Sequence, residues 1–325
     1  MRIRPLLVVA VAVWALLPYG PAFCATDYPT KSVRLVVPFP PGGASDLAGR
    51  IMAQVLGKQL GATIFVDNRP GAGGTVGSEQ AVRSPADGYT LLLMAAGPIT
   101  VGPSIFPSYP FDVERDLAPV AIIATIPNIV TIHPSVPATD LAGFIAYARQ
   151  HPDEIDYASS GNGSLAHLSG ELLKQLTGIR MTHVPYRGTG PALADLVAGQ
   201  VKLLIDNMPP AMPFVRAGSL RALAVTGQAR SPAAPDLPTA VEAGLPGYVV
   251  ESWTGLAAPG GTPEPIITRL YEAMRAGLQD NEVRQQLGSL GAQVDIRSPQ
   301  DSRRVIAADT ERWRQLIASA HIRVD

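Results

Sequence analysis

A short apolar segment, a turn rich in proline and glycine, and an amphipathic helix follow one another directly in residues 33–60, VRLVVPFPPGGASDLAGRIMAQVLGKQL. The apolar run Val33–Val37 predicts a strand that is buried on both faces. After the turn at residues 38–43, a helix is predicted to begin near Ser45 or Asp46, because apolar residues at 47, 51, 55, 56 and 60 recur at helical spacing. Such a unit predicts an α/β fold that binds ligands at the carboxyl ends of its strands.

The start of this predicted helix is a candidate site for a small anion. The first N–H groups of a helix have no intrahelical partner, and the positive end of the helix dipole lies there. Gly42 and Gly43 have no side chain to block a close approach, so the turn favours a carboxylate as ligand. The residues predicted to contact it are Phe39, Pro40, Gly42, Gly43, Ala44, Ser45 and Asp46. The alternative is an ordinary helix start capped by Ser45 or Asp46, and this stretch alone favours neither.

The first 25 residues of the 325 have the pattern of a secretory signal. Arg2 and Arg4 precede an apolar stretch at residues 6–17, and cleavage is predicted near residues 24–25. Cys24 is the only cysteine, so the mature chain is predicted to lack disulfides and a catalytic thiol. A lipid anchor on Cys24 is an alternative that Phe23 fits poorly.

Composition excludes several functional classes. The net charge is −1 and charged residues make up 16% of the chain, so there is no basic surface to suggest nucleic acid. The 31 glycines and 31 prolines are scattered between apolar runs, which is typical of an α/β protein with many tight turns. The 300 residues after the signal are enough for two domains of ordinary size.

A second strand–turn–helix unit spans residues 155–176. Its turn consists of Ser160, Gly161, Asn162, Gly163 and Ser164, and it predicts a second anion site at a helix start. The turn matches a G-x-G-x-x-A nucleotide pattern, but residues 178–190 contain no acidic residue to hold a ribose. An anion site without a nucleotide is therefore preferred. His167 is predicted to be a packed, hydrogen-bonded residue rather than a catalyst.

Further candidates lie at the ends of other predicted strands. Ala95 and Ala96 follow a strand at residues 89–94, and Asp206 follows one at residues 201–205. The strand-like runs 120–124 and 129–132 are interrupted by Pro127 and Asn128, which suggests a crossing between two lobes, and residues 248–256 suggest the return. Three helices are predicted near the C-terminus, at residues 265–278, 281–287 and 299–320.

No local motif points to catalysis. The chain has neither G-x-S-x-G nor H-E-x-x-H, and its five histidines show no metal-ligand spacing. We therefore predict no catalytic residue, no metal and no cofactor. Two anion sites in two halves of the chain instead suit a cleft that closes on a small carboxylate.

Several stretches together carry a family resemblance. They are YPTKSVRLVVPFPPGGASD at 28–46, VDNRPGAGGTVG at 66–77, DGYTLLL at 87–93, SSGNGSLAHLSGELLK at 159–174, HVPYRGTGPALADLVAGQV at 183–201, DNMPPAMPFVRAGSLRALAVT at 206–226 and ERWRQLIASAHIRVD at the C-terminus. The sequence resembles the periplasmic solute receptors of tripartite tricarboxylate transporters, also called the Bug family, over essentially the whole mature chain.

The resemblance implies a type II periplasmic binding protein fold with two α/β lobes, a ligand cleft between them and two crossing segments. Lobe 1 would comprise residues 26–124 and 253–325, and lobe 2 residues 125–252. The resemblance also implies a monomer in the periplasm that binds a carboxylate through main-chain amides and has a membrane permease as its partner. Family members often carry Ser or Thr where this chain has Ala95 and Ala96, which removes possible hydroxyl donors.

Asp46 leaves two alternatives open. A carboxylate beside an anion site repels a second carboxylate unless it caps its own helix. If Asp46 faces the cleft, it favours a ligand that also carries an amine.

The predicted function is a non-enzymatic receptor for a small organic acid or acidic amino acid. Two rivals remain at this level. One is a secreted enzyme with His167 or Asp206 as acid or base, and the other is the ligand-binding part of a sensory system.

Overall fold

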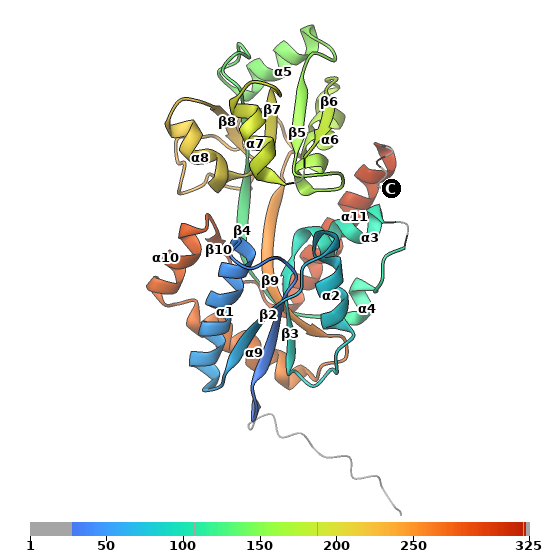
Figure 1. Ribbon diagram of the computed structural model, residues 1–325, viewed down its shortest axis with the longest axis vertical. Helices are drawn as coiled ribbons and strands as arrows, with labels where there is room; N and C mark the ends of the chain where they lie inside the picture. The colour runs from blue at the N-terminus through green and yellow to red at the C-terminus, as the bar shows by residue number, and fades with distance from the viewer. Residues whose placement is uncertain (1–27, 107, 187, 321, 323–325) are drawn as a thin grey trace, which may run out of the picture.

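The computed structural model describes residues 28–106, 108–186, 188–320 and 322. The predicted signal segment and Cys24 lie outside these residues. Within them, no helix has both the length and the apolar character needed to cross a bilayer. Two lobes are stacked along the long axis of the molecule, and both combine a sheet with helices (Figure 1).

The first lobe is built on three parallel strands that continue into an antiparallel part. The strands β2 (Ile64–Asn68), β1 (Val33–Val37) and β3 (Thr90–Ala95) are parallel, and β9 (Glu251–Pro259) runs antiparallel beside β3. Its helices are α1 (Ala44–Leu60), α2 (Thr75–Val82), α4 (Val113–Asp116), α9 (Glu264–Gly277) and α10 (Asn281–Ser289). Short helical turns η2 (Ala72–Gly74), η3 (Gly97–Val101) and α3 (Gly102–Ile105) complete its connections, and β10 (Gln293–Val294) pairs with the long strand β4 (Leu117–Ile132).

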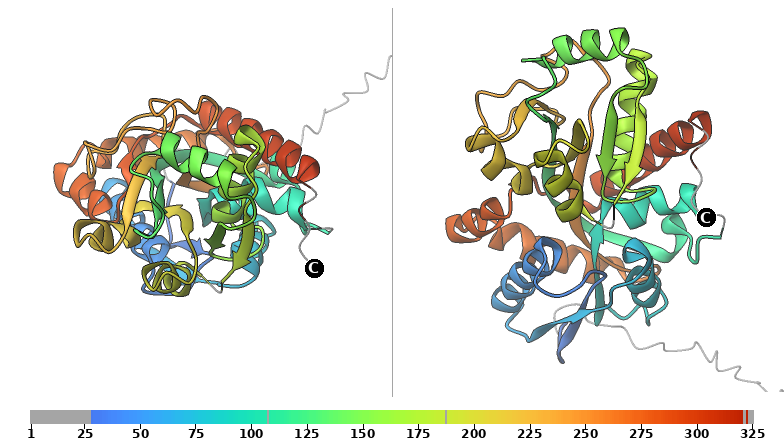
Figure 2. Two further views of the ribbon diagram at one scale, coloured as in Figure 1. Left: turned by 90° about the horizontal axis from the view of Figure 1, so that it is seen from above. Right: turned by 45° about the horizontal axis from the view of Figure 1, so that its top comes forward.

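The second lobe repeats the same plan. The strands β6 (Thr182–Pro185), β5 (Asp156–Ser159) and β7 (Leu203–Asn207) are parallel, and β8 (Arg221–Val225) pairs with β4. Four helices belong to this lobe: α5 (Leu141–Gln150), α6 (Leu165–Thr177), α7 (Thr189–Val197) and α8 (Met208–Arg216). Both lobes therefore hold their helices against a mixed sheet with a parallel part and an antiparallel part, and the α/β class predicted from the sequence is confirmed (Figure 2).

One long strand, β4 (Leu117–Ile132), passes through both lobes. Its first part pairs with β9 as far as Pro127 opposite Glu251, and its last part, from Asn128, pairs with β7. The prediction of two strands interrupted at Pro127 and Asn128 is wrong, because β4 is continuous there. The predicted crossing at this point is nevertheless present, since the partners of β4 change from one lobe to the other.

Strand register places the carboxyl ends of both sets of parallel strands near this crossing. Ala95, at the end of β3, lies beside Thr254, which pairs with Ala124. Asn207, at the end of β7, pairs with Asn128. Ala124 and Asn128 are only four positions apart, or about 13 Å along the strand. The turns that follow the parallel strands of the two lobes therefore face each other.

The last helix, α11 (Pro299–Ser319), packs against both lobes. Ile306 belongs to a hydrophobic cluster with β3 and β9 of the first lobe, whereas Trp313 and Leu316 are buried among residues of the second lobe. The Ser302 hydroxyl accepts a hydrogen bond of 2.8 Å from the N–H of Ile122 in β4. The predicted helix at residues 299–320 is confirmed, and it spans the crossing along one side (Figure 1).

Gly49 allows α1 to lie close to the sheet, which fixes where its N-terminus points. A Cβ atom at Gly49 would come within 2.6 Å of Val37 Cγ2 and 3.3 Å of Leu93 Cδ1. We expect Gly49→Ala to lower the free energy of unfolding by about 1–3 kcal/mol, measured by urea denaturation.

Gly288→Ala is the matched control, because a Cβ atom there meets nothing within 4 Å in α10. We expect it to be neutral or to stabilise by up to about 1 kcal/mol through helix propensity. Equal effects of the two substitutions would contradict the close packing of α1.

Candidate functional site

The turn before α1 is held by Asp46 from inside. The carboxylate of Asp46 accepts hydrogen bonds from the Gly42 N–H at 2.9 Å, from Arg50 Nε at 3.0 Å and from Asn68 Nδ2 at 2.9 Å. The residue is only 2% exposed, and these bonds, led by that from Arg50, lower the pKa of Asp46 to about 2. The charged carboxylate of Asp46 therefore stabilises the turn that precedes its own helix, and we call these three hydrogen bonds the brace of the first turn.

This geometry corrects two expectations about the first turn. The helix begins at Ala44 with Gly43 as N-cap and has no side-chain cap, so neither Ser45 nor Asp46 caps it in the way predicted. The N–H of Gly42 is already bound by Asp46 and is not a free donor for a ligand. Gly42 instead supplies the left-handed backbone conformation, with φ of +85°, that the turn needs.

At the start of α1, three N–H groups without an acceptor among the described residues belong to exposed or half-buried residues. Within the described part of the chain, the N–H groups of Gly43, Ala44 and Ser45 have no acceptor, and the first intrahelical bond runs from Leu47 to Gly43. The helix has 17 residues, so its dipole also favours an anion here. These groups lie at the end of the first lobe that faces the second lobe (Figure 1).

Phe39 and Asn68 fix the rest of the first turn. Asn68 Nδ2 also donates to the carbonyl oxygen of Phe39 at 3.1 Å, which ties the end of β2 to the turn after β1. The ring of Phe39 lies against Gly74 and, with Pro98, leaves no room there for a side chain. Three turns that follow parallel strands thus meet at one edge. Pro40 is exposed beside them.

The turn before α6 is likewise held by its own residues. The Gly163 N–H donates to His167 Nδ1 at 3.1 Å, and the Ser164 N–H donates to the Gly161 carbonyl at 3.1 Å. The Gly161 N–H donates to Ser159 Oγ at 3.2 Å, and Ser164 caps the helix by accepting from the N–H of His167.

The second turn consequently has fewer free donors than predicted. The N–H groups of Gly161, Gly163 and Ser164 are occupied. Those of Ser160 and Asn162 have no acceptor among the described residues.

His167 is packed, as expected, and its ring lies on a second histidine. The ring centroids of His167 and His183 are 3.8 Å apart with planes 4° from parallel, and the ring of Tyr157 lies 5.0 Å from His183 and 6.5 Å from His167. His183 Nε2 lies 2.6 Å from Ser159 Oγ. Burial lowers the pKa of both histidines, that of His183 to about 4, so both rings are neutral at pH 7.

Asn128, Ala95 and Ala96 lie at the crossing. Asn128 is 1% exposed, its Nδ2 lies 3.5 Å from Ser169 Oγ, and its Oδ1 has no partner among the described residues. Ala95 is half-buried and Ala96 is buried, so neither presents a large surface to a ligand. These residues shape the base of the space between the lobes.

Asp206 is engaged inside the second lobe. Its carboxylate accepts from Thr189 Oγ1 at 2.7 Å and from the N–H of Asn207 at 2.8 Å. Burial raises the pKa of Asp206, and these two hydrogen bonds oppose the rise. The side chain adjoins Leu193 and Ala211, so it joins α7 and α8 to the end of β7. The strand β7 is parallel to β5, with Ala158 opposite Leu204, so Asp206 follows β7 next to where the second turn follows β5.

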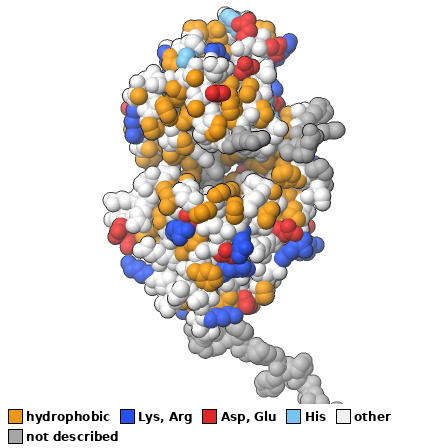
Figure 3. Space-filling model, viewed as in Figure 1, with side chains coloured by type: hydrophobic (Ala, Val, Ile, Leu, Met, Phe, Trp, Pro, Cys, Tyr) orange, Lys and Arg blue, Asp and Glu red, His pale blue; other side chains and the backbone are white. Residues whose placement is uncertain are grey.

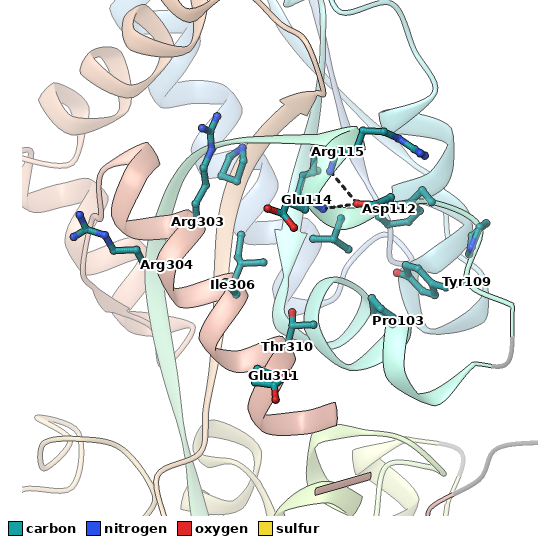
Figure 4. Close-up of a pocket in the computed structure, with 16 residues that line it drawn as sticks. Pro103, Tyr109, Asp112, Glu114, Arg115, Arg303, Arg304, Ile306, Thr310 and Glu311 are labelled. Carbon is teal, nitrogen blue, oxygen red and sulfur yellow. Dashed lines mark hydrogen bonds between the residues drawn. The ribbon is translucent and has the colours of Figure 1, made fainter. Parts of the chain in front are cut away.

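The space between the lobes is visible as a hollow on the face shown in Figure 3. A groove of about 940 Å³ lies elsewhere, between α4, the start of β4 and α11 (Figure 4). None of the predicted site residues lines this groove, and its Arg115, Arg304 and Glu311 are exposed and paired with their own neighbours. The described residues contain no cluster of three or more His, Cys, Asp or Glu that could hold a metal ion.

Comparison with known proteins agrees with this architecture. The family model described as "Tripartite tricarboxylate transporter family receptor" matches residues 48–322. Protein BugT of Bordetella pertussis (strain Tohama I) is 39% identical over 290 residues, which is 89% of each chain.

Two solved structures are similar over nearly the whole chain. An R. palustris protein solved with adipate is 40% identical with a TM-score of 0.79, covering 91% of this chain and 99% of its own. MatC from Rhodopseudomonas palustris, solved with bound malate, is 36% identical with a TM-score of 0.75, covering 89% of this chain and 100% of its own.

Two lobes, two crossing strands and facing helix N-termini define the periplasmic solute-binding fold, which the similar structures share. Within that class, the chain belongs to the tripartite tricarboxylate transporter receptor family. The resemblance noted in the sequence and the fold that it implied are thereby confirmed.

Sequence reasoning missed Asn68, His183 and Ser159. Asn68 ends a strand that neighbours β1, and His183 is paired with Tyr157 in the parallel register of β5 and β6. Those positions follow from which strands are adjacent, so only a correct strand order would have revealed them.

Asp46→Asn tests the brace of the first turn. We expect it to lower the free energy of unfolding by about 1–3 kcal/mol at pH 7, because a buried charge-assisted network is lost. The folded-state pKa lies below the ordinary 3.8, so the carboxylate stabilises the fold above about pH 4 and this contribution is lost as the pH falls toward 2. The difference in the free energy of unfolding between the variant and the wild type should therefore decrease as the pH falls from about 4 toward 2.

Asp301→Asn is the matched control, since Asp301 is also the third residue of its helix but its side chain is 53% exposed. We expect Asp301→Asn to change the free energy of unfolding by no more than about 0.5 kcal/mol. If Asp46→Asn altered ligand selectivity without altering stability, the carboxylate would be a ligand contact and not a brace.

Proposed function

We propose that this chain is an extracytoplasmic receptor that binds a small organic carboxylate between its lobes and delivers it to a membrane permease. The observation that carries the proposal is the set of three unpartnered N–H groups at Gly43, Ala44 and Ser45, at the positive end of a long helix facing the other lobe. The donors at Ser160 and Asn162 would close on the ligand from the second lobe.

The comparisons support this ligand class. Two similar proteins were solved with adipate and malate, both dicarboxylates. A dicarboxylate has an anionic group for each of the two turns, and it needs no cationic side chain when helix N-termini supply the donors. The affinity expected for such a receptor is about micromolar or tighter.

Binding without chemical conversion is favoured by how the candidate acid–base groups are used. His167 Nδ1 accepts from Gly163, and the Asp206 carboxylate accepts from Thr189 and Asn207, so both have internal partners. The family supports a permease as partner and the periplasm as location, after cleavage near residues 24–25. We place the lobe boundaries at 124/125 and 252/253, beside the Pro127–Glu251 pair, where rotation would open the cleft.

A binding screen tests the proposal. The mature chain, unfolded and refolded to remove any bound ligand, is assayed by thermal shift against mono-, di- and tricarboxylates, amino acids and aromatic acids. A ligand that binds only the folded state raises the melting temperature, and we expect four- to six-carbon dicarboxylates to do so. Absence of binding by every carboxylate, or turnover of a bound one, would overturn the receptor proposal.

Ala44→Pro removes one proposed ligand donor without removing a helix bond. Ala44 is the first residue of α1, where proline is well tolerated, and Gly43 before it has the extended conformation that proline requires. We expect about tenfold weaker carboxylate binding by calorimetry, with stability changed by less than about 1 kcal/mol.

Asn281→Pro is the matched control at the first residue of α10, which likewise follows an extended N-cap, Asp280. We expect it to leave binding unchanged. Full affinity in Ala44→Pro would show that the main-chain amide of Ala44 does not hold the ligand.

A further inference from the structure

The two ligand turns share one local motif but use different side chains for it. In each, the N–H of the residue two before the helix donates to the side chain four residues later, Gly42 to Asp46 and Gly163 to His167. A carboxylate with a pKa of about 2 does not change charge between pH 4 and pH 7. An imidazole has its ordinary pKa within that range, so the second turn contains the element that can respond to protons.

The hydrogen bond from Gly163 requires an unprotonated Nδ1 on His167. A neutral ring that accepts at Nδ1 carries its proton on Nε2, whereas an imidazolium has a proton on both nitrogens and cannot accept. Protonation of His167 would therefore place the N–H group on Nδ1 opposite the N–H group of Gly163, with no acceptor between them. The Gly163 N–H would then have no acceptor. The turn would lose the hydrogen bond that joins Gly163 to His167 in α6.

His183 makes a charged His167 more costly. Its ring lies flat on that of His167 at 3.8 Å, and Ser159, whose hydroxyl contacts His183, also accepts from the Gly161 N–H. The pair therefore contacts the turn at two points, Gly161 through Ser159 and Gly163 directly. Two stacked imidazolium rings would repel each other at this distance.

Among the described residues, the charged side chains that act on the pair are Glu171 and Lys174, and they do not offer a free counterion. Glu171 in α6 accepts from the Tyr157 hydroxyl at 2.6 Å and from Lys174 Nζ at 2.8 Å, so its charge is already paired. From α11, the residues that share the buried cluster of α6 are uncharged, namely Trp313, Leu316 and Ile317.

We propose that His167 and His183 form a positioning pair that holds the second ligand turn, and that protonation of His167 releases the turn and weakens carboxylate binding. The proposal rests on the proposed function for its effect on ligand, but the state of the rings is testable without one. His167 is 8% exposed and acts through Gly163, so it is a positioning residue.

The pH window follows from the direction of the shifts. Burial lowers the pKa of both rings when the turn is held, and a released turn would return them toward the ordinary 6.5. The released state then binds more protons, so the free energy that holds the turn decreases as the pH falls below about 6.5. For His183 the decrease ends near its folded-state pKa of about 4.

Nitrogen NMR of the histidine rings in the wild-type protein, without ligand, is the first test. At pH 7 we expect His167 to show an unprotonated Nδ1 and a protonated Nε2, with no titration near pH 6.5. The opposite tautomer, or titration of His167 at its ordinary pKa, would overturn the proposal even if carboxylates bind.

Substitution at His167 gives the second test, with carboxylate affinity measured from pH 7.5 to pH 5. Asparagine places an uncharged acceptor where Nδ1 lies, so His167→Asn should bind within about threefold of wild type at pH 7.5, whereas His167→Ala should bind about tenfold more weakly. On acidification, the wild type should lose affinity relative to His167→Asn, because the titration of the ligand is common to both.

His133→Asn, at a half-buried histidine that contacts Ser135 and lies outside both ligand turns, is the control and should behave as wild type. Equal affinities of the Asn and Ala variants, or superimposable pH profiles of wild type and His167→Asn, would overturn the proposal. Failure of the wild type to bind any carboxylate at pH 7.5 would instead overturn the proposed function, and the ring spectra would still decide the state of the pair.

Discussion

The pairing of β4 with strands of both lobes is the constraint on which the rest of the structure depends. β4 pairs with β9 as far as Pro127 and with β7 from Asn128, so one continuous strand fixes the position of each sheet relative to the other. Because β3 ends beside Thr254 and β7 ends beside Asn128, the open ends of both parallel sets are brought to the same crossing. The registers of β4 with β9 and with β7 therefore determine where the candidate ligand groups of both turns lie.

Each turn is then organised by a side chain from the helix that it precedes. Asp46 binds the Gly42 N–H and His167 binds the Gly163 N–H, which removes one amide from each predicted anion site. The amides that remain free are held in place by this arrangement, so fewer donors are available but they are better oriented. Preorganised donors lower the conformational entropy that the protein must lose on binding, which suits a receptor that captures dilute solutes.

The two turns differ in how the side chains that hold them depend on pH. The Asp46 network stays charged at any pH above about 4, and it ties β1, β2 and α1 together through Asn68 and Arg50. The His167–His183 stack is neutral and buried beside a Glu171–Lys174 pair. If the two turns hold the ligand as proposed, one half of the site keeps its charge while the other half responds to protons.

The sequence by itself determined the local units: the strand–turn–helix pattern at residues 33–60 and 155–176, the α/β class, the family and the place of the crossing. The local units, the class and the crossing depend on periodicity and turn residues, which are local in the chain, whereas the family followed from the resemblance of several stretches taken together. Only the tertiary structure decided that β4 is unbroken at Pro127, that Asp46 occupies the Gly42 amide, and that His183 stacks on His167. The physical reason is that the continuity of β4 and the histidine stack depend on strand order and register. The bond from Asp46 to Gly42 is local, but the same carboxylate is also held by Asn68, which strand order brings to it from far along the chain.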